Sequence, residues 1–126
     1  MKLSKVKEIY KTTTIVTAST IKFKILLLEK CLEYVKNGIQ AIQMGDIAIS
    51  HDYLTRTQQL LTEGISLISL ETESGLGIIA LYEYMNKQLI EANIERDPNI
   101  LQEVVTILEE LLNAWREAYV IRNNKI

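Results

Sequence analysis

The side chains that could do chemistry are few, and they are not grouped as an active centre requires. His51 is the single histidine of the chain, so the chain alone can build neither a His-containing metal pair nor a His-based triad. No Glu stands three residues before it, so the Glu-x-x-His motif of di-iron bundles is missing too. We interpret His51 as a surface histidine. Cys31 falls on the apolar side of a predicted helix and is interpreted as a core thiol, since a reactive thiolate needs a basic, exposed neighbour.

Two acidic pairs and one glycine-containing stretch complete the inventory. The pairs Glu71/Glu73 and Glu109/Glu110 are explained by a solvated loop and a solvated helix face. Residues 74–77 (SGLG) lack both the preceding strand and the GK[ST] ending of a phosphate loop. Nothing pairs an acid with a base or activates a nucleophile. We therefore expect a protein that is not an enzyme and that uses no cofactor and no metal.

The composition indicates one domain with apolar surface to spare. The chain has 126 residues, of which 48% are hydrophobic, and part of that apolar surface can serve a partner rather than the core. Tyr82, Tyr84 and Trp115 fit core anchors or interface hot spots, and both interpretations stay open.

The net charge of −2 hides an uneven distribution. Residues 1–36 hold eight Lys and three Glu, a balance of +5, whereas residues 37–126 hold six Lys/Arg and thirteen Asp/Glu, a balance of −7. The lysines are spread out, without a dense cluster or interleaved Arg, so we expect no nucleic-acid partner. A single cysteine forms no internal disulfide, no segment approaches 18 apolar residues, and residues 1–14 contain no apolar signal-peptide core. These features predict a cytoplasmic protein without a membrane span.

Apolar residues recur at alternating steps of three and four, which is typical of packed amphipathic helices. We predict helices over about 20–44, from Asp46 to about 70, over about 76–95 and over about 98–122. Ser19 and Asp97 are the expected N-caps, and Gly45 is the expected left-handed C-cap. The longest seam consists of Ile21, Ile25, Leu28, Leu32, Val35, Ile39 and Ile42. Short connections make neighbouring helices antiparallel, so the predicted fold is all-α, an up-down-up-down four-helix bundle.

The first 18 residues differ from the rest and are predicted to be a leader, with the bundle at 19–126. Residues 4–11 can make a short helix, but the β-branched run at 12–17 offers no helical face and favours an extended segment. Two kinds of function fit such a bundle. One is a chaperone or adaptor whose grooves receive an amphipathic segment of another protein. The other is a structural module that self-associates through the same apolar stripes.

Four blocks of the sequence are distinctive: YKTTTIVTAS at 10–19, ILLLEKCL at 25–32, LYEYM at 81–85 with LIEAN at 89–93, and AWREA at 114–118. These blocks resemble the flagellar export chaperone family FliS. Together they extend over about residues 10–119, in order and with the family's spacing. The chain departs from the family pattern where Thr13 replaces Asn, Thr20 replaces Pro, Leu28 replaces Tyr and Lys30 replaces Gly. Lys22 and Lys24 also replace acidic residues. The departures cluster at the leader and the first long helix.

The resemblance implies a cytoplasmic chaperone that binds the disordered C-terminal segment of flagellin in apolar grooves of the bundle. Such a chaperone would prevent premature polymerisation and aid delivery to the flagellar type III export apparatus. It would be a monomer or weak dimer, and the export gate or an assembly regulator is a further partner to consider.

Six residues are the candidate partner contacts: Tyr10, Ile15, Val16, Leu28, Tyr53 and Tyr84. The three in the leader would plug a groove until the client displaces them. The face carrying Tyr82, Met85 and Leu89 is expected to be core, which leaves Tyr84 on the outer side of the same helix.

Overall fold

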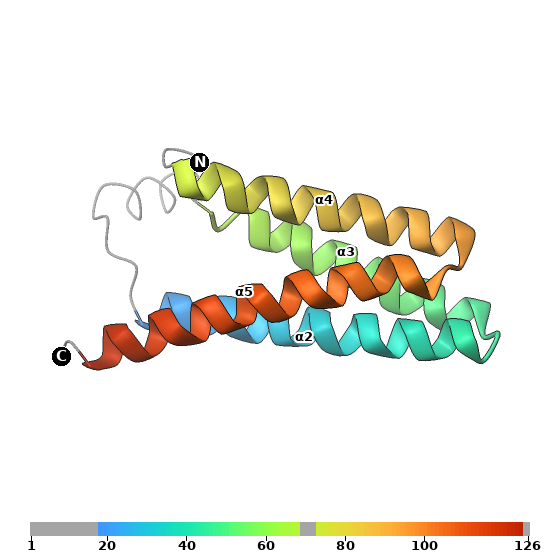
Figure 1. The fold of residues 1–126 in the computed structure, drawn as a ribbon, viewed down its shortest axis with the longest axis horizontal. Coiled ribbons are helices and arrows are strands. Elements are labelled where there is room, and N and C mark those ends of the chain that lie inside the picture. The colour runs from blue at the N-terminus through green and yellow to red at the C-terminus, as the bar shows by residue number, and fades with distance from the viewer. Residues whose placement is uncertain (1–17, 69–72, 125–126) are drawn as a thin grey trace.

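The structure is a computed structural model that describes residues 18–68 and 73–124, and in those ranges it contains four α-helices and no strand (Figure 1). They are α2 (Ala18–Gln43), α3 (Ile47–Ile65), α4 (Glu73–Glu95) and α5 (Pro98–Asn124). Consecutive helices run antiparallel (Figure 1), and α2 and α4 each pack against both α3 and α5. The predicted all-α four-helix bundle is confirmed. Of the predicted leader, residues 1–17 lie outside the described residues, and Ala18 already belongs to α2.

Short polar caps explain the tight turns at one end of the bundle. Gly45 adopts a left-handed φ of 74°, the Gly45 N–H donates to the Ile42 carbonyl at 3.0 Å, and the Asp46 N–H donates to the Ala41 carbonyl at 2.9 Å. This pattern closes the end of a helix and confirms Gly45 as the C-cap of α2. The Asp46 side chain then caps α3 by accepting from the Ile49 N–H at 3.2 Å.

The α4–α5 connection has only two residues between the helices. Arg96 takes a left-handed φ of 55°, and Asp97 accepts from the Asn99 N–H at 2.9 Å, which confirms it as the N-cap of α5. Pro98 begins the helix, as expected for a residue whose missing N–H is not needed there.

Three predicted boundaries were wrong. α2 begins at Ala18, so Ser19 lies inside the helix instead of capping it. α4 begins at Glu73 rather than near residue 76. α3 ends at Ile65, not near residue 70, because the Ser66 hydroxyl donates to the Glu63 carbonyl at 2.6 Å and the following amides bond three residues back. That tighter turn ends the α-helical ladder although the apolar pattern continues.

The core draws on all four helices. Its large side chains with no more than 1% exposure are Leu28, Val35, Leu54, Leu61, Met85, Leu89, Leu101, Val104, Leu108 and Leu112. Each is a seam residue of its helix, and full burial of one such side chain is worth about 1.5–3 kcal/mol. Tyr82, at 2% exposure, joins Met85 and Leu89 in the core, so this face of α4 is buried as predicted.

Gly64 is required where α2, α3 and α4 meet. A Cβ added there would lie 2.8 Å from the Tyr82 ring and 3.4 Å from Leu27. A side chain at this position would therefore push the Tyr82 ring out of the core, and the absence of one sets how closely α3 approaches its neighbours.

Candidate partner-binding groove

Two rows of side chains line the outer seam between α2 and α3. Both rows step by alternating four and three residues, so each forms one stripe along its helix. The α2 row is Phe23, Leu27, Lys30, Tyr34, Asn37 and Ala41, followed by Met44 just after the helix. The α3 row is Ile49, Tyr53, Arg56, Leu60 and Glu63, followed by Leu67 in the turn after the helix. We call the surface between these rows the α2/α3 groove. Its apolar members include four exposed side chains: Phe23, Met44, Ile49 and Leu67.

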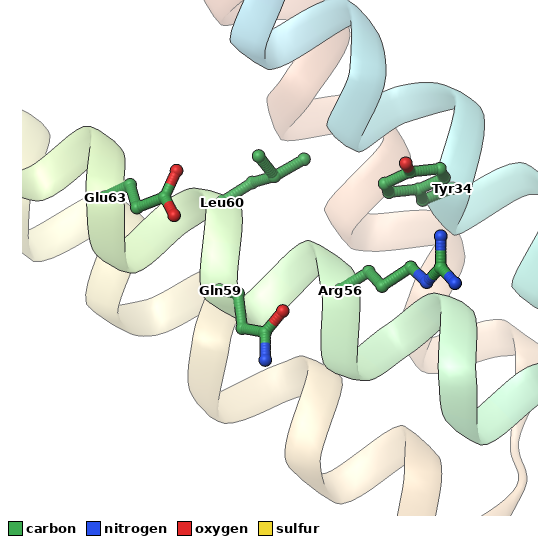
Figure 2. A pocket seen from close by; sticks show the side chains of 5 residues that line it. All are labelled: Tyr34, Arg56, Gln59, Leu60 and Glu63. Atoms are coloured by element: carbon green, nitrogen blue, oxygen red, sulfur yellow. The ribbon is translucent and has the colours of Figure 1, made fainter.

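An aromatic pair divides the groove into two hollows. The ring centroids of Tyr34 and Tyr53 are 5.7 Å apart with 42° between the ring planes. One hollow, of about 280 Å³, lies toward the α2–α3 turn and is lined by Asn37, Gln40, Ala41, Met44, Asp46, Ile49 and Tyr53. The other, also about 280 Å³, is lined by Tyr34 from α2 and by Arg56, Gln59, Leu60 and Glu63 from α3 (Figure 2).

Two cations flank the dividing ring. The Lys30 ammonium lies 5.4 Å from the Tyr34 ring centroid, and the Arg56 guanidinium lies beside the same ring (Figure 2). A hydrogen bond to Tyr34, and then the hydrogen bond and charge of Asp52, raise the pKa of Arg56. The hydrogen bond and charge of Glu33 raise the pKa of Lys30. Both cations also hold an exposed partner on their own helix, with Lys30–Glu33 at 3.2 Å and Arg56–Asp52 at 3.0 Å.

The seams on either side of α4 carry several polar bridges, whereas in the groove Arg56 of α3 hydrogen-bonds to Tyr34 of α2. Across α3/α4, the Asn86 amide nitrogen lies 3.4 Å from the Thr62 hydroxyl, and that of Asn93 lies 2.7 Å from His51 Nδ1. Across α4/α5, the Tyr84 hydroxyl and the Gln88 amide both donate to Glu103. His51 is exposed, as predicted.

The α2/α5 seam is bridged by charged groups. Arg116 Nη2 lies 2.8 Å from Glu29 Oε2, and the Lys24 ammonium lies 4.4 Å from the centroid of the Trp115 ring. Burial lowers the pKa of Lys24, while the face of an aromatic ring attracts a cation. The half-buried Trp115 therefore packs against the core and also holds a lysine of the neighbouring helix.

The predicted contact residues do not lie together. Tyr53 lines the α2/α3 groove. Tyr84 is 43% exposed but faces Glu103 across the α4/α5 seam, on a different side of the bundle. Leu28 is completely buried, because the 4-3 seam that contains it is the inner one. Tyr10, Ile15 and Val16 lie outside the described residues.

The sequence analysis overlooked the second row on each helix. On α2 that row includes Phe23, Tyr34 and Ala41, and on α3 it includes Leu60. Their common 4-3 spacing was the available signal. Spacing alone does not distinguish an inner row from an outer one, because both repeat with the same period.

Cys31 is buried, as predicted, and burial raises the pKa of its thiol to about 12. Within residues 18–68 and 73–124, no three His, Cys, Asp or Glu side chains are grouped so that they could hold a metal ion. In the same ranges, no helix has the length and apolar character needed to cross a membrane.

A helical bundle with exposed apolar side chains and two hollows along the α2/α3 groove has the features of a helix-bundle binding protein. Residues 2–122 match the model of the family described as "Flagellar protein FliS", and the chain belongs to this family. The resemblance inferred from the sequence is thereby confirmed, and it identifies the protein as a flagellar export chaperone.

Curated relatives agree with this assignment. The chain is similar to the flagellar secretion chaperone FliS of Bacillus subtilis, with 27% identity over 109 residues that make up 86% of this chain and 82% of the relative. It is also similar to the flagellar secretion chaperone FliS of Vibrio cholerae, with 28% identity over 100 residues, 78% of this chain and 74% of the relative.

Proposed function

We propose that this export chaperone acts in the cytoplasm by binding the disordered C-terminal segment of flagellin in the α2/α3 groove. Covering that segment prevents premature polymerisation and presents the client for delivery to the flagellar type III export apparatus. The observation that supports the proposal most strongly is the α2/α3 groove itself, an apolar seam with two hollows in a family of export chaperones.

The size of the groove suits a disordered client. A segment that folds on binding loses conformational entropy, so it needs an extended contact surface to bind tightly. The groove follows α2 from Phe23 to Met44, which is about 30 Å at the helical rise of 1.5 Å per residue. A contact of that length accommodates several turns of an incoming helix.

The leader supplies a second element of the proposal. Residues 1–18 would cover the groove in the free chaperone, with Tyr10, Ile15 and Val16 as apolar plugs that the client displaces. The leader joins the bundle at the end of α2 that carries Phe23. A chain of 17 residues can extend about 55–60 Å, so the whole groove is within its reach.

Chain truncation tests the role of the leader. We expect a variant lacking residues 1–18 to bind the flagellin C-terminal segment more tightly, because the competing plug is gone. Isothermal titration calorimetry measures the affinity and thermal denaturation measures the stability. Unchanged affinity together with unchanged stability would rule the cap out.

Self-association is the competing explanation for the exposed apolar row. The proposed chaperone is a monomer or weak dimer, and the export gate or an assembly regulator can bind a different face, for example the one around Tyr84. Size-exclusion chromatography with light scattering, with and without the flagellin segment, separates the two explanations. We expect a monomer or weak dimer that forms a complex with the segment. A stable oligomer that ignores the segment would end the chaperone proposal.

A further inference from the structure

The centre and the two ends of the α2/α3 groove differ in charge. Lys30 from α2 lies 5.4 Å from the Tyr34 ring centroid, and Arg56 from α3 hydrogen-bonds to Tyr34. Asp46 lines the hollow near the turn, and Glu63 lines the other hollow. The groove is therefore positive over the dividing ring and negative toward the outer parts of both hollows.

Apart from the hydrogen bond of Arg56 to Tyr34, the partners of the two central cations are exposed carboxylates of their own helices. Glu33, Asp52 and Arg56 are more than half exposed, and Lys30 is half exposed. Exposed pairs of this kind contribute little to stability. An incoming carboxylate can replace either partner without loss to the fold, and it would gain two cations from two helices at once.

The spacing of the hollows restricts the shape of the occupant. Their lining residues are centred about seven residues apart along α2 and about ten apart along α3, which corresponds to about 10–15 Å. A helix covers that distance in two to three turns. The hollows mix polar side chains with apolar ones such as Leu60, Met44 and Ile49. Because α2 and α3 offer no strand edge, an extended segment would leave part of its N–H and C=O groups against the apolar side chains, whereas a helix satisfies these groups internally.

We propose that the α2/α3 groove selects a client segment that binds as an amphipathic helix with one acidic side chain between two apolar anchors. The anchors, about seven to ten residues apart in the client, enter the two hollows, and the carboxylate lies over Tyr34 between Lys30 and Arg56. Asp46 and Glu63 repel acids at the ends and so fix the register. This inference rests on the proposed function, since it describes how the same groove recognises its client.

Double-mutant cycles test the central contact. The probe is the C-terminal segment of the flagellin from the same genome, with each Asp and Glu changed to Lys in turn. The chaperone variants are Arg56→Glu and Lys30→Glu. Lys36→Glu is the matched control, because Lys36 is exposed on α2 but outside the groove row. Calorimetry gives the Kd of each pair, and isotope-edited infrared spectroscopy of a carbon-13-labelled segment gives its helicity on binding.

We expect Arg56→Glu and Lys30→Glu each to weaken binding of the unmodified segment roughly three- to tenfold at low salt, and less at high salt because the contact is exposed to screening. One Asp→Lys or Glu→Lys change in the segment restores affinity in the Arg56→Glu background. Lys36→Glu changes the Kd by less than about twofold and couples to none of the client charges.

The outcomes separate this inference from the proposed function. If the unmodified chaperone does not bind the segment, the proposed function fails. If it binds, but no client charge couples to Arg56 or Lys30, or the bound segment is not helical, this inference fails and the proposed function stands. Arg56→Glu and Lys30→Glu could instead change dimerisation, or the effect of deleting the leader, and leave client affinity unchanged. The two cations would then bind a second copy of the chain or the leader, and the inference would be overturned.

Discussion

The α2/α3 groove and the seams of α4 are built from helices of the same length class, yet their outer edges differ in chemistry. Amides, hydroxyls and a carboxylate bond across the α4 seams, as Asn93 with His51 and Tyr84 with Glu103 show. Across the α2/α3 groove, two aromatic rings meet, Arg56 hydrogen-bonds to one of them, and apolar side chains remain exposed at both ends. Polar groups that already bond to each other gain little from a partner, whereas exposed apolar surface gains from being covered.

Shortening a side chain to alanine should cost more unfolding free energy in the core row of α2 than in its groove row. Leu28→Ala removes a completely buried side chain of α2 and should lower the free energy of unfolding by about 2–5 kcal/mol. Phe23→Ala removes a half-exposed one from the groove row of the same helix and should cost less than about 1 kcal/mol. Urea denaturation measures both. An equal cost for the two variants would mean that the outer row is buried in solution and the groove is closed.

Client affinity should distinguish the groove from the α4/α5 seam. Tyr34→Ala and Tyr53→Ala remove the aromatic pair that divides the groove, and each should weaken binding of the flagellin segment by roughly 10- to 100-fold, as at aromatic hot spots. Tyr84→Ala is the matched control on another side of the bundle and should change the Kd by less than about threefold. Calorimetry decides between the two sites, and a larger loss for Tyr84→Ala would assign the client to the α4/α5 seam.

The buried thiol on the inner side of α2 should make the free energy of unfolding fall at alkaline pH. Burial raises the pKa of the Cys31 thiol to about 12, above its value in the unfolded chain. Because the pKa of the thiol is higher in the folded chain than in the unfolded chain, the protonated thiol contributes fully to the free energy of unfolding below pH 9. That contribution is lost as the pH rises toward 12. Linkage gives a loss of about 1.4 kcal/mol by pH 10.

Cys31→Ala serves as the reference for that measurement. The difference in unfolding free energy between the wild type and this variant should shrink by about 1.4 kcal/mol between pH 8 and pH 10. Urea denaturation at both pH values gives the difference, and using the difference cancels the contribution of Tyr82, whose pKa burial also raises. A constant difference would show that the thiol is accessible to water.

The smallest effect is expected at the bridged α4/α5 seam. The hydrogen bond to Glu103 is the largest cause of the raised pKa of Tyr84. Glu103→Gln should lower the pKa of Tyr84 toward its ordinary value and change client affinity by less than about twofold. Ultraviolet titration of the phenol measures the first effect. Glu109→Gln, on the same helix, should leave the phenol unchanged.

Much of the fold was predictable because it depends on local signals. The 4-3 rows of apolar residues located the four helices, and Gly45, Asp46 and Asp97 marked their ends through backbone groups only a few residues away. The end of α3 was not predictable in this way. Its apolar pattern continues through Leu67 and Ile68. The Ser66 hydroxyl, which donates to the Glu63 carbonyl, competes there with the backbone hydrogen bonds of the helix.

The candidate site was less predictable, since it depends on which row faces inward. Leu28 and Tyr34 both lie on 4-3 rows of α2, yet one is completely buried and the other lines the groove. That choice is made by contacts between helices, such as Gly38 against Leu54 and Gly64 against Tyr82. The pairing of Tyr84 with Glu103 likewise joins residues 19 positions apart on different helices, beyond the range of a periodicity argument.

The tight turn at Gly45 has a consequence for folding kinetics. It makes α2 and α3 a helical hairpin, so every side chain that lines the α2/α3 groove belongs to one continuous stretch, residues 23–67. Contacts between residues close in sequence form early, because little loop entropy is lost in making them. The surface that we assign to the client is therefore local in the chain, and we expect it to take shape on the ribosome before α4 and α5 are synthesised to complete the core beneath it.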